Sequence, residues 1–203
     1  MEATRAALLE AAESLFAKEG LDVSLDAICE RAGFTRGAFY VHFADRDALL
    51  VAVMEVVGAR FLSQMFAALE THTSDESSIG GGALASAASR FVNAVEGGTY
   101  PLMGPGHIQF HQLLDACARS SKVRAQYRGL VEASIEHVAS LAMLDRRSGI
   151  LRPELEPSAL GKTMLATIIG AQTMVELGVP IDAASLAKTM VDAVRARPRR
   201  DEE

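Results

Sequence analysis

The stretch LDAICERAGFTRGAFYVHFADRDALL, residues 25–50, decides the fold, because it sets two short helix patterns on either side of a glycine turn. Ser24 stands before the first pattern and Thr35 before the second, and both residue types are good N-caps. The glycine of the turn ends the first pattern, since glycine adopts the left-handed C-terminal conformation cheaply. The stretch therefore predicts two helices joined by the turn GFT, over residues 24–32 and 35–41.

Helical periodicity extends on both sides of this stretch. Apolar residues repeat every three to four positions over residues 7–16, and Gly20 supplies a stop. Asp45 is an N-cap for a further helix, whose apolar line runs over residues 49–69. Three short helices followed by one long helix are expected over roughly the first seventy residues.

Three polar or glycine-rich stretches break the rest of the chain, at residues 71–82, 97–106 and 149–157. Proline is sparse and long β-branched runs are missing, which favours helix over strand. The expected fold class is all-α. The helices expected in this part of the chain cover residues 84–96, 107–118, 122–147, 158–177 and 182–196.

Composition excludes several classes of protein. Hydrophobic residues make up 49% of the 203 residues, enough for a real core. The first ten residues carry charges and no apolar signal region, and the uncharged apolar run at residues 163–175 is too short to span a bilayer. Cys29 and Cys117 lie far apart without a CxxC spacing, so reduced thiols are expected. We expect a soluble cytoplasmic protein with no membrane partner.

Charge limits the kind of nucleic-acid contact that the chain can make. The formal net charge is −6, and residues 1–47 hold nine acidic and five basic residues. That balance argues against a protein that coats nucleic acid non-specifically. From Ala32 to Ala44, however, the chain carries Arg36 and His42 and no acidic residue. Any nucleic-acid footprint is therefore expected to be small and directed.

The second helix of the pair has the residues that a DNA recognition helix needs. Such a helix presents its N-terminal residues to base edges in the major groove. Thr35 and Arg36 stand at that N-terminus, and arginine is the best reader of guanine O6 and N7. Gly37 lets the backbone approach the groove wall closely. These positions predict direct contacts with bases.

Neighbouring positions supply phosphate contacts and an anchor. Tyr40 and His42 can donate hydrogen bonds to phosphate oxygens, and Arg46 can contact the same DNA backbone. Phe39 and Phe43 point the other way and are expected to anchor the short helix. The alternative is an ordinary helical hairpin inside a bundle, with Tyr40 and His42 as polar caps.

The longer stretch SLDAICERAGFTRGAFYVHFADRDALL resembles the tetracycline-repressor (TetR) family of one-component transcriptional regulators. The shared pattern is A-G-x-[ST]-x-G-x-[FL]-Y-x-H-F with a downstream basic residue before a leucine, and the resemblance is strong over residues 5–54. Ala44 stands where many members have lysine, which implies modest non-specific affinity. The resemblance implies that the DNA is lined by Ser24, Thr35, Arg36, Gly37, Tyr40, His42 and Arg46.

The resemblance also implies a homodimer, since one helix-turn-helix unit covers only a few base pairs and two half-sites need two copies. A twofold interface of two helices per chain is expected, from residues 122–147 and 158–177. Small residues in the second helix allow close approach. Burial of both helices against their own core is the alternative. The expected interface residues are Gly161, Leu165, Ile168, Ile169 and Gln172.

A cavity for a small-molecule effector, between the fourth and eighth helices, is a further implication of the resemblance. Methionine and aromatic side chains suit an adaptable apolar pocket, and histidine supplies a polar group. Ordinary core packing is the alternative for each of them. The candidate lining residues are Phe61, Met65, Phe91, Met103, His107, Phe110, His111, Tyr127 and Met143.

Metal binding and catalysis have weaker support in the sequence. His107 and His111 have the i,i+4 spacing of a zinc pair, but the glutamate of an HExxH motif is missing. A pocket wall or helix surface is therefore favoured over a metal site. The chain also lacks phosphate-binding loops, GxSxG elbows and dinucleotide fingerprints. Neither a cofactor nor an enzymatic activity is expected.

The sequence thus predicts an all-α homodimeric repressor that binds a palindromic double-stranded DNA operator and is released by a small molecule. Residues 1–47 are expected to form a three-helix helix-turn-helix domain, residues 48–197 a ligand-binding and dimerisation domain, and residues 198–203 a disordered tail. Two alternatives stay open. One is a helical ligand- or metal-binding protein whose N-terminal motif does not bind DNA, and the other is a metal-dependent enzyme based on His107 and His111.

Overall fold

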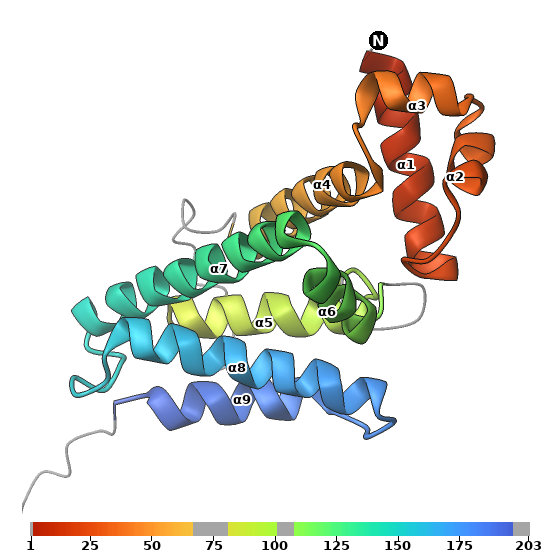
Figure 1. Cartoon of the computed structure of the whole chain (residues 1–203). Helices are drawn as coiled ribbons and strands as arrows, with labels where there is room; N and C mark the ends of the chain where they lie inside the picture. The colour runs from red at the N-terminus through yellow and green to blue at the C-terminus, as the bar shows by residue number, and fades with distance from the viewer. Residues whose placement is uncertain (1, 67–80, 101–107, 197–203) are drawn as a thin grey trace, which may run out of the picture. The chain divides into compact units, whose positions relative to one another are not determined.

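The computed structural model describes residues 2–66, 81–100 and 108–196 (Figure 1). The regular elements within these ranges are all α-helices, which confirms the predicted fold class, and Leu151 and Arg195 form an isolated antiparallel bridge. The helices are α1 (Glu2–Glu19), α2 (Leu25–Ala32), α3 (Arg36–His42), α4 (Arg46–Phe66), α5 (Ala83–Glu96), α6 (Phe110–Arg119), α7 (Ser121–Arg147), α8 (Pro157–Glu176) and α9 (Ala183–Val194).

Contacts divide the chain into two compact units. The first unit contains α1, α2, α3, α4 as far as Phe61, α6, and α7 as far as Leu130. The second unit contains the remaining parts of α4 and α7 together with α5, α8 and α9. The boundary predicted from the sequence lies at residue 48, whereas these contacts keep α6 and most of α4 with the first three helices. The roles of the two predicted domains stay predictions, and the predicted tail lies outside the described residues.

The first unit has one hydrophobic core, to which all of its helices contribute apolar side chains, including Val123 of α7. Phe16 of α1, Ile28 of α2, Phe39 of α3 and Leu49 of α4 are almost completely buried there, and α6 adds Leu113. A helix of seven residues is unstable in water by itself. The short α3 therefore depends on the burial of Phe39 for its position.

Caps fix where α2, α3 and α4 begin. The Ser24 hydroxyl accepts a hydrogen bond from the backbone of α2 at 3.1 Å, and the Thr35 hydroxyl does the same for α3 at 3.3 Å. The Asp45 carboxylate accepts one from α4 at 2.7 Å. Gly33 ends α2 with a φ of 77°, a conformation that favours glycine. The helix boundaries predicted around the turn are confirmed.

The second unit contains a cap that comes from a distant part of the chain. Gly82 precedes α5 and has no side chain with which to cap it. Instead, the carboxylate of Asp145, near the end of α7, accepts hydrogen bonds from the backbone N–H groups of Ala83 at 2.6 Å and Leu84 at 3.0 Å. Asp145 is buried. It therefore ties α5 to α7 next to the apolar cluster that Leu84 joins.

Candidate nucleic-acid interface

α2, α3 and the turn between them form the helix-turn-helix that the sequence predicts. Phe39 and Phe43 face inward and are buried, with their ring centroids 5.5 Å apart. Arg36, Tyr40 and Val41 face outward, and Tyr40 is 56% exposed. α3 therefore has one anchored face and one free face, as a recognition helix requires.

The other predicted DNA contacts of this region lie at the starts of α2 and α3 or along α3. Gly37 is exposed near the start of α3, and His42 at its end is half-buried. Ser24 and Thr35 use their hydroxyl oxygens as acceptors in the two caps. A hydroxyl that accepts one hydrogen bond can still donate its proton to a phosphate. Contact of these residues with DNA stays a prediction.

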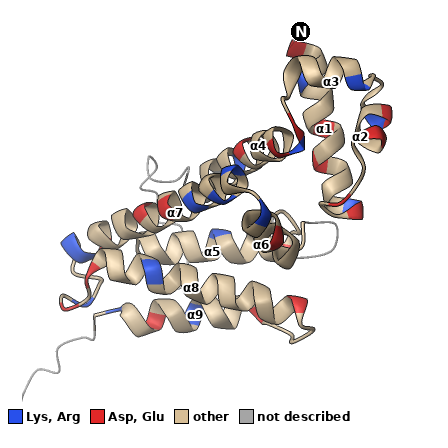
Figure 2. Ribbon diagram, in the orientation of Figure 1, with Lys and Arg blue, Asp and Glu red and all other residues tan. Residues whose placement is uncertain are grey.

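Arg36 is the one arginine of α3, a helix with no acidic residue and no lysine (Figure 2). Its guanidinium forms an ion pair with Asp26 of α2, with 2.5 Å between Nε and Oδ1. Both side chains are more than half exposed. Acidic and basic side chains both occur on α1, α2 and α4, so charge in this unit is mixed (Figure 2). The formal positive charge of α3 is therefore concentrated in a single, paired arginine.

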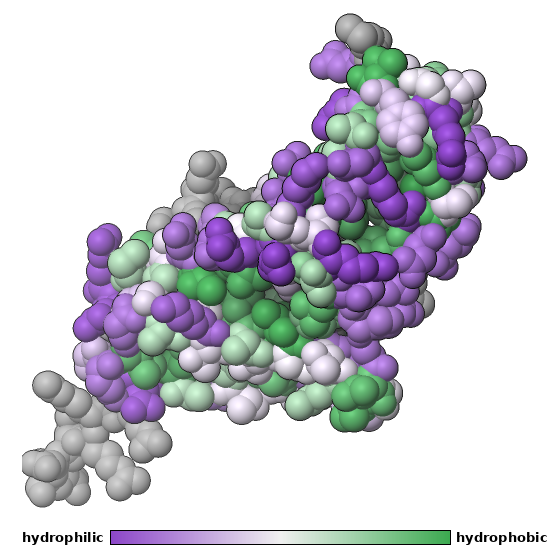
Figure 3. All heavy atoms as spheres, in the orientation of Figure 1, coloured by the Kyte–Doolittle hydropathy of each residue, from purple (hydrophilic) through white to green (hydrophobic). Residues whose placement is uncertain are grey.

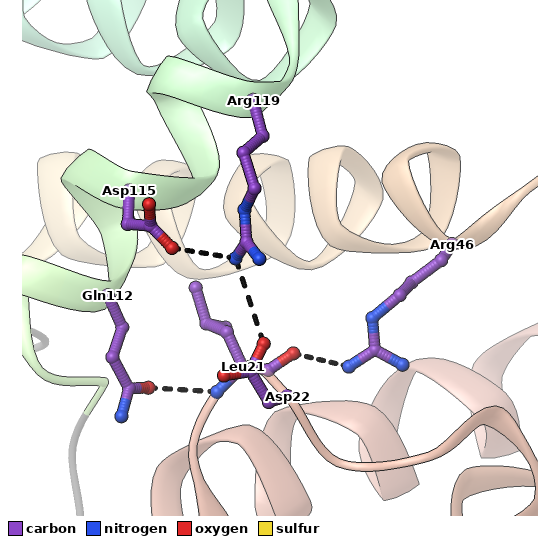
Figure 4. Close-up of polar contacts among 6 residues, drawn as sticks. All are labelled: Leu21, Asp22, Arg46, Gln112, Asp115 and Arg119. Carbon is purple, nitrogen blue, oxygen red and sulfur yellow. Dashed lines mark hydrogen bonds and ion pairs between the residues drawn. The ribbon is translucent and has the colours of Figure 1, made fainter.

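The Arg46 side chain forms a polar contact with another part of its own chain (Figure 4). Its guanidinium donates a hydrogen bond to the backbone oxygen of Leu21, in the turn between α1 and α2. The same group lies over the Phe16 ring, 5.7 Å from the centroid, and burial lowers the pKa of Arg46. The sequence suggested a contact between Arg46 and the DNA backbone. The structure gives this side chain a position in which it links α4 to the α1–α2 turn.

α6 contacts the same turn (Figure 4). The Gln112 side-chain oxygen accepts a hydrogen bond from the Leu21 N–H at 2.9 Å. Arg119 pairs with Asp115 of its own helix at 2.9 Å and lies 3.7 Å from Asp22. We call Leu21, Asp22, Arg46, Gln112 and Arg119 the turn clasp. The turn clasp could not be predicted from the sequence, because 91 positions separate Leu21 from Gln112 and no local pattern signals such a pairing.

Replacing Arg46 with alanine is expected to lower the free energy of unfolding by about 2 kcal/mol, because one hydrogen bond from a charged donor and one cation–π contact are lost. Urea denaturation followed by circular dichroism measures this. Arg119→Ala is the matched control, since its ion pairs are exposed and worth about 0–1 kcal/mol. Unchanged stability in Arg46→Ala, combined with weaker DNA binding, would instead support the phosphate contact suggested by the sequence.

Four of the predicted effector-pocket residues lie in the first unit. Phe110 of α6 is buried, and its ring contacts that of Tyr127 on α7 with 6.3 Å between centroids. Burial raises the pKa of Tyr127 to about 12, so its hydroxyl is a neutral donor at neutral pH. Phe61 is half-buried, and His111 is exposed on α6.

The other predicted pocket residues are in the second unit or are not described. Phe91 is buried, with its ring centroid 5.3 Å from that of Tyr100, and Met143 is exposed. Over the described ranges, no three His, Cys, Asp or Glu side chains are grouped as they would be to hold a metal ion. The pocket as a whole stays a prediction. Met103 and His107 lie outside the described residues, and the side chain of Met65 is not described either.

Two of the predicted interface residues are engaged within their own unit. A Cβ atom on Gly161 would lie 2.6 Å from the backbone oxygen of Ile135, so α8 and α7 approach closely at this glycine. Gln172 is 2% exposed, and its Nε2 donates to the Tyr100 hydroxyl at 2.8 Å. For both residues the structure shows the packing within one chain that the sequence analysis left open as the alternative. The remaining three, Leu165, Ile168 and Ile169, are half-buried.

The end of α8 and the turn after it carry exposed apolar residues that the sequence analysis did not single out. Leu177 is 76% exposed. Apolar side chains also gather on the visible surface of the second unit in Figure 3. Among the described residues, no helix combines the length and apolar character needed to cross a bilayer. We call the following group the α8 apolar end: Met174, Val175, Leu177 and Val179.

Comparison with protein families gives one match. The family described as bacterial regulatory proteins, tetR family, matches residues 8–53. This range runs from α1 into α4 and contains the whole helix-turn-helix. Comparison with curated proteins found no match.

Several solved structures share the fold of the chain. A TetR-family transcriptional regulator from Cytophaga hutchinsonii has a TM-score of 0.76 and 15% identity, with 98% of each chain covered. A transcriptional regulator from Saccharomonospora viridis in complex with choline has a TM-score of 0.73 and 18% identity, with 97% of this chain and 100% of that chain covered. A SmeT–triclosan complex has a TM-score of 0.71 and 22% identity, with 97% and 93% covered.

At these identities the solved structures show the fold alone, whereas the family match falls on the residues of the candidate interface. The matched range holds the anchoring phenylalanines and the exposed Arg36 and Tyr40 of α3. Residues 8–53 therefore form the helix-turn-helix domain of a tetR-family bacterial regulatory protein.

Proposed function

We propose that this regulator represses transcription by binding a palindromic operator as a homodimer, and that a small molecule releases it. The free face of α3 is the observation that supports this best. Phe39 and Phe43 anchor the helix while Arg36 and Tyr40 stay exposed. Such a face presents its N-terminal residue to base edges and its later residues to phosphates.

Dimerisation is proposed through α8. The α8 apolar end is exposed, and Leu165, Ile168 and Ile169 keep part of their surface accessible. Exposed apolar side chains that lie together mark contact surfaces between proteins. A twofold-related pair of chains would set two recognition helices about 34 Å apart, one turn of the duplex. That spacing would match an operator with two half-sites.

An effector site is proposed within the second unit, beside Phe91 and Tyr100, with Gln172 as its polar contact. Two structures of the same fold hold small molecules, choline in one and triclosan in the other. In this chain the buried Gln172 Oε1 has no hydrogen-bond partner within the described residues, while Nε2 donates to Tyr100. An unmet buried acceptor is unfavourable by about 1–3 kcal/mol. A ligand that donates a hydrogen bond to this oxygen would remove that penalty.

The effector would act on DNA binding through helices that both units share. α4 and α7 continue from the second unit into the first, and α6 supports the α1–α2 turn through the turn clasp. A ligand that favours one arrangement of these helices would change how the helix-turn-helix is held. A coupling free energy of about 1–3 kcal/mol is enough for a useful switch.

Footprinting and gel retardation with the DNA upstream of the chain's own gene test the proposal. We expect a protected region with two symmetric half-sites and, by light scattering, two protein copies on each operator. One copy per site would contradict the dimer. Lack of retention on that DNA, together with no preference in a selection from random duplexes, would contradict DNA binding.

Arg36→Ala is expected to lose about 1–3 kcal/mol of discrimination at one base pair of each half-site, because a bidentate arginine–guanine contact is worth that much. Affinities for a set of single-base operator variants measure the loss. Arg31→Ala on α2, whose arginine contacts Ser14, is the matched control and should leave the base preference unchanged. An unaltered preference profile in Arg36→Ala would remove Arg36 from base readout.

A further inference from the structure

We infer that Asp26 sets the sequence specificity of Arg36. The inference rests on the proposed DNA binding. The Asp26 carboxylate holds the Nε side of the Arg36 guanidinium and leaves its terminal amino groups to donate to guanine. Asp26 is thus a positioning residue for base readout and makes no base contact of its own.

The ion pair joins the starts of two helices that are themselves held in place. Asp26 Oδ1 lies 2.5 Å from Arg36 Nε. Asp26 is in the first turn of α2, behind the Ser24 cap, and Arg36 is the first residue of α3, behind the Thr35 cap. Two backbone hydrogen bonds close the turn between the helices. The backbone of Asp26 therefore has a defined position relative to the backbone of Arg36, within reach of the ion pair.

The contact with Asp26 determines which N–H donors of Arg36 remain available to bind DNA. A guanidinium has five N–H donors in one planar fork, and its terminal amino groups can donate together to guanine O6 and N7. An arginine without a neighbouring carboxylate is free to turn toward the nearest phosphate. Asp26 opposes that turn, because it attracts Nε and repels phosphate. In this arrangement the terminal amino groups of Arg36 remain available to donate to guanine.

Neutralisation of the Arg36 charge by Asp26 also favours specific over non-specific DNA binding. The Arg36–Asp26 pair has no net charge, so it adds little to the attraction between this unit and DNA of any sequence. Hydrogen bonds to guanine depend on donor position and survive the pairing. The pair therefore weakens non-specific binding more than it weakens specific binding, which raises the ratio of the two affinities.

A role in folding stability explains the pair less well. Both side chains are more than half exposed, at 57% for Arg36 and 70% for Asp26. Ion pairs this exposed contribute little to stability. An acidic side chain beside the recognition helix repels the DNA phosphates. A role for Asp26 in base readout therefore explains its position better than a role in stability.

Asp26→Asn in the full-length protein tests the inference, with affinities measured for the operator and for scrambled duplexes over a range of salt. We expect the operator-to-scrambled affinity ratio to fall about fivefold or more, since one bidentate contact loses its orientation. Affinity for scrambled DNA should rise. Its logarithmic salt dependence should steepen by about one unit, because Arg36 becomes free to neutralise a phosphate.

Glu30→Gln is the matched control, because it removes one negative charge from the same exposed surface of α2. It should raise affinity for both duplexes and leave their ratio unchanged. In the Arg36→Ala background, Asp26→Asn should no longer change the ratio. If the wild type discriminates between operator and scrambled DNA but Asp26→Asn leaves the affinity ratio unchanged, the inference is wrong and the proposed function stands. A wild type that does not discriminate overturns the proposed function and the inference together.

Discussion

Replacing Phe39 with alanine is expected to lower the free energy of unfolding by about 3–5 kcal/mol, the range for removing a buried phenylalanine from a core. Phe39 is 0% exposed, and it is the residue through which α3 reaches the core of the first unit. The seven-residue α3 has too few backbone hydrogen bonds to hold its shape alone. Sequence-specific DNA binding should therefore be lost in the same variant, even where most of the chain remains folded.

Val41→Ala is the control for Phe39→Ala, because Val41 is on the same short helix and is 69% exposed. Its expected effect on stability is within about 0.5 kcal/mol. Urea denaturation gives the stability of each variant, and gel retardation on the operator gives its DNA binding. A Phe39→Ala protein as stable as Val41→Ala would show that α3 does not depend on this core contact.

The second large effect is expected from Asp145→Ala, which should lower the free energy of unfolding by about 3 kcal/mol. Two hydrogen bonds to a charged acceptor are lost, and each is worth about 1.5–3 kcal/mol when buried. The first backbone N–H groups of α5 would then have no cap, because Gly82 has no side chain to replace the carboxylate. Asp145→Asn keeps one acceptor oxygen and should lose less.

Asp192→Ala provides the comparison for Asp145→Ala within the second unit. Its carboxylate pairs with Lys188 on the surface of α9 at 2.5 Å, an i,i+4 contact worth about 0.3–0.5 kcal/mol. The expected order of destabilisation is Asp145→Ala, then Asp145→Asn, then Asp192→Ala. Equal stability of Asp145→Ala and Asp192→Ala would mean that the bonds from Asp145 do not hold α5 in place.

Local features were predictable because neighbouring residues create them. Ser24, Thr35 and Asp45 cap the helices that the sequence assigned to them, and Gly33 ends α2 as expected. The burial of Phe39 was also predicted, since it follows from helical spacing. Each of these signals lies within about four residues of the structure that it determines.

Residues that act across long sequence separations were missed or assigned another role. Gln112 and Arg119 contact the α1–α2 turn, and nothing in their neighbourhood indicates this. Arg46 has the position of a phosphate contact in the motif, yet its guanidinium binds the Leu21 oxygen. Gln172 was expected at the dimer interface, and in the structure it is buried beside Tyr100 of its own chain.

The sequence by itself therefore determined that this chain is helical, where its first helices begin and end, and that α3 exposes Arg36 and Tyr40 while it buries Phe39. Only the tertiary structure decided that Asp26 holds Arg36, and that Asp145 caps a helix 61 residues away. The physical reason is the sequence separation over which each kind of interaction acts. Helix propensity and capping act within one or two turns, whereas ion pairs and buried hydrogen bonds depend on which helices the core brings together.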